Sequence, residues 1–188
     1  MKKNTRRNIL ILLAAVFPFF TQADFERLPL PPLTPGDSLP EGWSGHRAPH
    51  LNRIGGAHRV VEVEGQPVLQ LSKTRFESVL MVHTEVDLPP GQSVLELGLR
   101  MRVPEIDLPE QAPGRNRFWA TVVFLDADGE ESSETFPHLS FGEADPDWTL
   151  ARKEYQIPDG AERVRVALQM LNCVGIWEIS AIGLRVKP

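Results

Sequence analysis

Apolar and polar residues alternate with a period of two over much of the chain, which is the pattern of β-strands that bury one face. In residues 94–103 every second side chain is apolar, and Arg100 and Arg102 lie among the residues between them. In residues 163–171 the apolar set again occupies alternate positions, and Arg165 and Gln169 share the opposite face. These segments are therefore predicted to be strands whose charged faces point away from a core.

Eight segments of this kind predict eight strands, at residues 59–63, 68–72, 79–88, 94–103, 118–126, 148–157, 163–171 and 175–186. Glycine- and proline-containing turn signals separate several of them, for example Glu64-Gly65 and Pro158-Asp159-Gly160. The 188 residues include 17 prolines, and no stretch sustains a period of 3.6 residues. Long helices are therefore not expected.

The segment 118–126 differs from the others because it is apolar on both faces. Phe118 and Val122 belong to one face, and Trp119 and Val123 belong to the other. A strand of this kind lies at the centre of a sheet or beneath a second layer. The pattern predicts an all-β fold, a jelly-roll β-sandwich of two antiparallel sheets packed face to face.

The N-terminal residues have the pattern of an export signal. Four basic residues precede an apolar run at 9–20, and small residues follow up to Ala23. This predicts a signal peptide at 1–23, cleaved near Ala23, and a secreted or periplasmic protein. The run of about 12 residues is shorter than the ~20 residues of a transmembrane helix, and no later run is longer, so the mature chain is not expected to span a membrane.

The rest of the chain divides into two parts. Residues 24–41 contain five prolines and are predicted to form an extended linker or a strap on the domain. Residues 42–188 are predicted to form the β-sandwich. The one cysteine, Cys173, has no partner for an internal disulfide and lies in an apolar segment.

Charge limits the classes of partner. The formal net charge is −5, and removal of the four basic residues at the start leaves 16 basic against 25 acidic residues, a net charge of −9. A chain with this balance is not expected to bind nucleic acid or anionic membrane surfaces.

The order of several short motifs resembles that of galactose-binding-like jelly-roll modules, and in particular carbohydrate-binding modules of families 4 and 9. The motifs are Gly42-Trp43-Ser44, the segment 79–91, the hairpin 122–129, Trp148 followed by 155–161, and Gly175-Ile176-Trp177-Glu178. The resemblance covers about residues 37–187. It implies a β-sandwich that binds glycans without catalysis. It also implies a structural calcium site near the last strand, for which Glu178 is the candidate ligand, although a second acidic residue does not follow it. No other cofactor is expected.

Sugar binding needs an aromatic face for the apolar side of a pyranose and fixed polar groups for its hydroxyls. Trp119 is the candidate platform, and Thr121 shares its face of the strand. Polar side chains from other strands are predicted to line the same concave sheet, namely Arg100, Arg102, Arg165 and Gln169. The alternative is that Trp119 belongs to the core and the arginines form a solvated face paired with Glu96. Trp43, Trp148 and Trp177 are predicted to be structural.

The function predicted from these observations is a secreted, non-catalytic module that binds a polysaccharide or oligosaccharide. One alternative is a structural or protein-interaction sandwich of the cell envelope, with an envelope protein as its partner. Another is a polysaccharide hydrolase or lyase. Neither a nucleophile elbow nor a dinucleotide or P-loop motif occurs in the sequence, and no pair of carboxylates is marked by its context.

Overall fold

The computed structural model describes residues 26–36, 39–47, 56–76, 79–108, 117–132 and 138–188. These residues form eleven strands and loops, without a helix, in two antiparallel sheets. The fold predicted from the alternation is confirmed. The predicted signal peptide, residues 1–23, lies outside the described residues.

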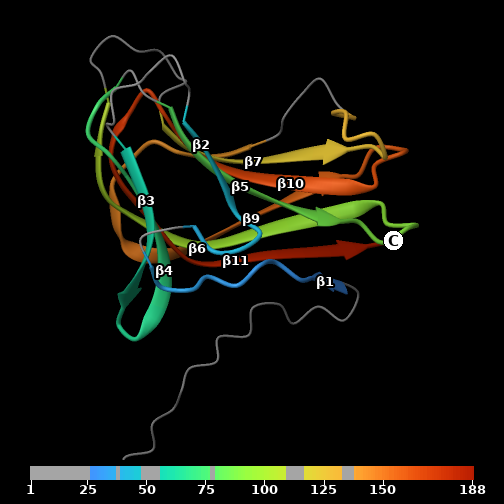
Figure 1. Cartoon of the computed structure of the whole chain (residues 1–188), viewed down its shortest axis with the longest axis horizontal. Helices are drawn as coiled ribbons and strands as arrows, with labels where there is room; N and C mark the ends of the chain where they lie inside the picture. Colours follow the sequence, from blue (N-terminus) through green and yellow to red (C-terminus); the bar gives the residue numbers. More distant parts are fainter. Residues whose placement is uncertain (1–25, 37–38, 48–55, 77–78, 109–116, 133–137) are drawn as a thin grey trace, which may run out of the picture.

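The six-stranded sheet has the order β3 (Gly56–Val63), β4 (Gln66–Lys73), β11 (Val174–Lys187), β6 (Val94–Asp107) and β9 (Asp145–Gln156). A short strand, β1 (Glu26–Leu28), pairs with the distal end of β11, where Leu28 lies opposite Leu184. Because β4 pairs only with residues 175–179 of β11, the β3–β4 hairpin diverges from β11 beyond that point (Figure 1).

The five-stranded sheet has the order β2 (Ser44–Arg47), β5 (Val79–Asp87), β10 (Arg163–Leu171), β7 (Arg117–Leu125) and β8 (His138–Phe141). It forms the second layer of the sandwich in Figure 1. All eight predicted segments overlap strands of the structure. β1, β2 and β8 were not predicted, because three or four residues are too few to show an alternation.

The core lies between the sheets and is built from alternate residues of the long strands. Trp177 of β11 is fully buried, and its ring stacks on Phe118 of β7 with centroids 5.5 Å apart. Its Nε1 donates to the sulfur of Met101 at 3.1 Å. Phe141 of β8 contacts the same ring, with centroids 5.7 Å apart. Trp177 therefore packs between the two sheets, which agrees with its predicted structural role.

Gly175 at the start of β11 lies where β6 approaches closely. Its φ is +135°, and a Cβ at this position would overlap the backbone carbonyl of Glu105. Only glycine fits such a conformation and such an approach. This explains why a glycine directly precedes the apolar part of the last strand.

The proline-rich segment lies against the sandwich where it is described. Gly36 exchanges two backbone hydrogen bonds of 2.9 Å with Val60 of β3. The indole Nε1 of Trp43, a residue only 7% exposed, donates to the carbonyl of Pro31 at 3.2 Å. Residues 28–33 are thereby held beside β11.

Candidate functional site

The outer face of the five-stranded sheet brings four of the predicted ligand residues together. Trp119 and Thr121 belong to β7, and Arg165 and Gln169 belong to β10. The two strands pair so that Gln169 lies opposite Trp119. The intervening residues of β7, such as Phe118 and Ala120, point into the core and are fully buried. The period-two pattern thus places these four side chains on one solvent-side surface, called here the Trp119 face.

Trp119 is half-buried on this face and does not belong to the core cluster. The imidazole of His138 on β8 stacks on its ring, with centroids 4.5 Å apart and planes 18° from parallel. The indole Nε1 is buried and has no hydrogen-bond partner among the described residues. Trp119 is thus partly covered, but it does not belong to the core between the sheets, as the alternative prediction required.

The floor of the Trp119 face consists of small side chains between larger ones. Thr121 and Ala167 lie opposite each other on β7 and β10, and they are 5% and 3% exposed although they point outward. The amide Nε2 of Gln169 donates to the hydroxyl of Thr121 at 3.2 Å. His83 of β5 extends the same row beyond Ala167.

An ion-pair cluster borders the Trp119 face along β5 and β10. The Nε of Arg165 donates to Glu85 at 2.8 Å, and Arg163 reaches the other oxygen of the same carboxylate at 3.2 Å. Glu131 lies 3.7 Å from Arg165 on the opposite side. Arg165 is therefore held in place between two carboxylates, and the cluster offers both donors and acceptors.

Three residues of this face escaped the sequence prediction, namely His138, His83 and Glu85. His138 begins a four-residue strand that lies outside the eight predicted segments. His83 and Glu85 alternate with apolar residues along β5. Their place on the outer face could have been read from that alternation, but their alignment with Trp119 depends on the register of three strands.

Arg100 and Arg102 do not lie beside Trp119, and this part of the predicted site is wrong. Both belong to β6, which pairs with β11 and β9 in the six-stranded sheet. Their side chains point outward, as predicted, but from the opposite surface of the sandwich. Alternation shows which residues of a strand point outward, but not which of two sheets the strand joins.

Arg102 and Glu178 form the centre of a polar row on this second surface. The Nε of Arg102 lies 2.6 Å from Oε2 of Glu178, and Gln70 donates to the other oxygen at 2.7 Å. Arg59 of β3 donates twice to Gln70, at 2.8 and 3.0 Å. Glu96 pairs with Arg185 instead, so the predicted pairing of Arg100 or Arg102 with Glu96 is also wrong.

Glu178 does not fit the calcium site that the resemblance implies. Both carboxylate oxygens accept hydrogen bonds, one of them from a guanidinium group. A cationic neighbour opposes the binding of a second cation at the same carboxylate. Among the described residues no group of three or more His, Cys, Asp or Glu side chains is placed to hold a metal ion.

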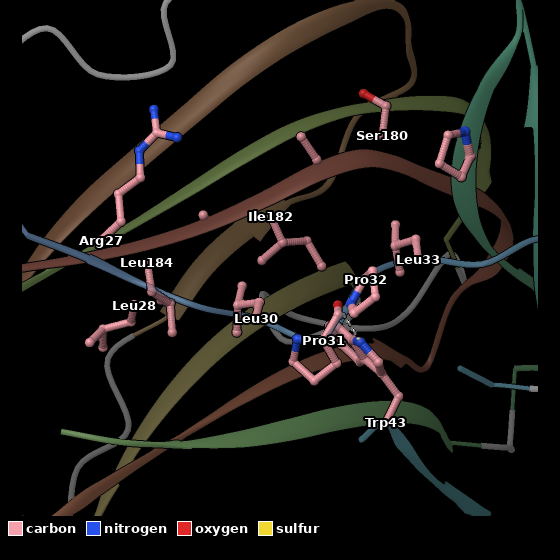
Figure 2. A pocket seen from close by; sticks show the side chains of 13 residues that line it. Arg27, Leu28, Leu30, Pro31, Pro32, Leu33, Trp43, Ser180, Ile182 and Leu184 are labelled. Atoms are coloured by element: carbon pink, nitrogen blue, oxygen red, sulfur yellow. Dashed lines mark hydrogen bonds between the residues drawn. The ribbon is translucent and has the colours of Figure 1, made fainter. Parts of the chain in front are cut away.

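Two hollows open elsewhere on the sandwich. One, of about 490 Å³, lies between residues 27–33 and β11, and Leu30, Trp43 and Ile182 are among its apolar lining residues. Arg27 and Ser180 lie on opposite sides of it (Figure 2). It occupies the region where β4 has diverged from β11 and β1 has not yet paired with it.

The second hollow has a volume of about 660 Å³ and borders β8, β9 and the end of β6. Glu143 and Asp145 line it, and so does Ser140, which lies opposite Trp119 in the sheet. Trp119 itself lines neither of these two hollows. The larger hollow therefore adjoins the Trp119 face across the edge strand β8.

Burial makes Cys173 an unreactive thiol. The residue is fully buried, and desolvation raises its pKa from 9.0 to about 11, against the opposing influence of the Lys73 charge. Burial also raises the pKa of Tyr155 above its ordinary value. Because folded Cys173 keeps its proton between its ordinary pKa and the raised one, folding stability falls as the pH rises through this interval.

Cys173 should not react with maleimide at pH 8 while the protein is folded. The thiolate is the reactive form, and both its low abundance and its burial oppose the reaction. We expect modification only after denaturation, at a rate typical of a free cysteine, as followed by mass spectrometry. Rapid modification of the native protein would contradict the buried position.

Comparison with solved structures shows the jelly-roll fold of carbohydrate-binding modules. The enzymatically active domain of tailspike protein 4 from bacteriophage CBA120 aligns with 78% of this chain at a TM-score of 0.59 and 13% identity. The CBM22-1 and GH10 modules of the Clostridium thermocellum xylanase 10B, solved with xylohexaose, align with 78% at a TM-score of 0.51 and 13% identity. The family 11 carbohydrate-binding module of the C. thermocellum cellulase Lic26A-Cel5E aligns with 76% at a TM-score of 0.50 and 12% identity.

The extent of these matches differs among the three proteins. The aligned region spans 19% of the tailspike chain, 26% of the xylanase chain and 86% of the family 11 module.

No protein-family model and no curated protein matches the sequence. The particular resemblance to families 4 and 9 stays a prediction. Within the described residues, no helix has the length and apolar character needed to cross a bilayer. The chain is thus a β-sandwich with the jelly-roll fold of the carbohydrate-binding modules among these matches.

Proposed function

We propose that the chain is a non-catalytic glycan-binding module and that the Trp119 face is its binding surface. The observation that carries the proposal is the half-buried indole of Trp119, stacked on an exposed imidazole, with the amide of Gln169 opposite it and the guanidinium group of Arg165 further along the same face. Aromatic rings contact the C–H face of a pyranose, while fixed polar groups select its hydroxyls. The fold shared with the family 11 module supports the same proposal.

Each group has a distinct part in the proposed binding. The pyranose contacts the stacked rings of Trp119 and His138. The amide of Gln169, oriented by Thr121, exchanges hydrogen bonds with the hydroxyls. Arg165 donates to ring or hydroxyl oxygens, and its partner Glu85 accepts from hydroxyl groups. Such hydrogen bonds contribute about 0.5–1.5 kcal/mol each, so we expect micromolar or weaker affinity for a single oligosaccharide.

Export is part of the proposal. The basic and then apolar start of the sequence supports a signal peptide cleaved near Ala23, which would bring the sandwich to the periplasm or the medium, where glycans are available. Mass spectrometry of the mature protein from the host tests this, and a retained N-terminus would contradict it.

Replacing Trp119 by alanine should abolish retardation in gels that contain the cognate neutral polysaccharide. Truncation of a central aromatic anchor costs about 2 kcal/mol or more, which corresponds to roughly a 30-fold loss of affinity. The control is Trp148→Ala, which removes a half-buried tryptophan from the opposite surface and should leave the retardation unchanged. Equal retardation of wild type and Trp119→Ala would contradict the assigned face.

The enzyme alternative has a separate test, because Glu143 and Asp145 line the hollow beside β8. We expect no release of reducing ends from any polysaccharide that the protein binds. Release that is lost in Glu143→Gln or Asp145→Asn would instead establish a hydrolase.

A further inference from the structure

The outer face of the six-stranded sheet carries a cluster of arginines that the proposed glycan site does not use. Beyond Gly98, this surface carries two ion pairs, Arg185 with Glu96 and Lys187 with Glu154. On the other side of Gly98, four arginines lie around the carboxylate of Glu178; they are Arg59 of β3, Arg100 and Arg102 of β6, and Arg152 of β9. This group of described residues, called here the arginine face, has a local excess of positive charge. The whole chain, by contrast, has a net charge of −5.

Two of these arginines are held in fixed positions. The guanidinium carbons of Arg100 and Arg102 lie over the ring of Trp148, at 4.8 and 4.7 Å from its centroid. Arg100 donates to the hydroxyl of Ser180 at 3.0 Å, and Arg102 donates through Nε to Glu178. Stacking and hydrogen bonds reduce the rotamer entropy that a ligand would otherwise have to remove. The ring of Trp148 thus positions the guanidinium groups, consistent with a structural role for this tryptophan.

An apolar contact surface adjoins the fixed guanidinium groups. Leu150 lies opposite Arg100 in the sheet and is 46% exposed, which is unusual for a large apolar side chain on a strand. In the next row Gly98 pairs with Gly183, and Gly98 is buried, so neighbouring atoms cover the backbone there. Arg152 flanks the glycine row on β9. The exposed Leu150 therefore lies on the sheet next to the positions of both Arg100 and Arg152.

This combination suits a sugar that carries a carboxylate. A guanidinium group binds a carboxylate through two parallel hydrogen bonds, and the exposed leucine can contact the C–H face of a pyranose. We propose that the arginine face binds a polysaccharide of uronic acid residues, at a site separate from the Trp119 face. The sandwich then has one binding surface on each sheet, for two ligands that differ in charge.

The test compares two polymers with the same backbone, polygalacturonate and its fully methyl-esterified form. Wild-type protein should be retarded in gels that contain polygalacturonate, and the retardation should decrease as salt is added. Its affinity for the methyl ester should be at least tenfold lower than its affinity for polygalacturonate. The Arg100→Gln/Arg102→Gln variant should bind polygalacturonate at least tenfold more weakly than wild type. Its charge-matched control is Arg75→Gln/Arg163→Gln, which removes two positive charges outside the arginine face and should retain the binding.

A second variant guards against loss of folding, because Arg102→Gln leaves Glu178 without its ion-pair partner. Arg100→Gln/Arg152→Gln leaves that pair intact and should show the same loss of polygalacturonate binding while the protein keeps a cooperative unfolding transition. Equal binding of the two polymers, or an equal loss in the control variant, would overturn the proposal. So would equal arginine-dependent binding to vesicles of anionic phospholipid, since the face would then be a general anion-binding surface.

The proposals for the two binding sites can be tested independently of each other. Trp119→Ala should lose neutral polysaccharide and keep polygalacturonate, and Arg100→Gln/Arg102→Gln should show the reverse. If Trp119→Ala alone removed polygalacturonate binding, the arginine face would have no ligand of its own, while the proposal for the Trp119 face would stand.

Discussion

Replacing Glu96 by alanine should lower the free energy of unfolding by about 3–5 kcal/mol, because it removes the carboxylate that forms an ion pair with the buried Arg185. The two side chains face outward from the centre of the six-stranded sheet, yet they are only 8% and 2% exposed. Oε1 of Glu96 accepts from Nε and Nη2 of Arg185, at 2.9 and 2.7 Å. Chemical denaturation followed by tryptophan fluorescence measures the effect.

Two further variants show whether the stability lost in Glu96→Ala comes from the burial of the ion pair or from charge pairing alone. Glu154→Ala removes an acidic partner of Lys187; Glu154 lies opposite Glu96 in the sheet, and its carboxylate is 53% exposed. It should cost less than about 1 kcal/mol, as exposed pairs do. Glu96→Ala combined with Arg185→Met should recover most of the stability lost in Glu96→Ala. If Glu96→Ala and Glu154→Ala lost similar amounts, the buried pair would not have the role described.

The substitution Trp177→Ala should lower the free energy of unfolding by about 3–5 kcal/mol, as complete truncation of a buried aromatic residue does. The ring is fully buried and contacts Phe118 and Phe141, which belong to the opposite sheet. Its removal leaves a cavity between the layers, next to the strands that hold Trp119 and His138. Denaturant unfolding measures this loss as well.

Trp177→Phe is the conservative comparison, because it keeps an aromatic ring but loses the contact of Nε1 with the sulfur of Met101. It should retain a large part of the stability. A loss in Trp177→Ala no larger than that in Trp177→Phe would mean that the ring does not fill the space between the sheets.

Much of the Trp119 face could be predicted because neighbouring strands in a sheet keep their alternation. Trp119 and Thr121 occupy alternate positions of one segment, and Arg165 and Gln169 occupy alternate positions of another. Once β7 and β10 pair, the outward positions of both strands form rows on one surface. The same rule predicted that Phe118 and its alternate neighbours would enter the core.

Assignment to a sheet could not be predicted in the same way. Residues 94–103 show as clear an alternation as residues 163–171, but the first segment enters one layer and the second enters the other. The choice depends on which strands pair over long sequence distances, as when β6 pairs with β11. Arg100 and Arg102 were therefore placed on the wrong surface, although their outward direction was correct.

Two other differences between the predicted and the observed site concern His138 and Glu178. His138 reaches Trp119 from β8, whose four residues show no recognisable period. Glu178 shows a related difficulty, because a lone acidic residue in a strand suggests a metal ligand until its neighbours are known. Gln70 and Arg102 come from segments more than 70 residues away in the chain, and they occupy its two oxygens.

The most direct test of the glycan-binding account uses the indole signals of the protein. The sequence contains four tryptophans, so a ¹H–¹⁵N spectrum should contain four indole resonances, which single substitutions assign. Titration with a neutral oligosaccharide should shift the Trp119 indole and the amides of Thr121 and Gln169, while the Trp148 and Trp177 indoles stay in place. Shifts confined to the Trp148 indole, or to residues around the hollow beside β1, would contradict the Trp119 face as the binding surface.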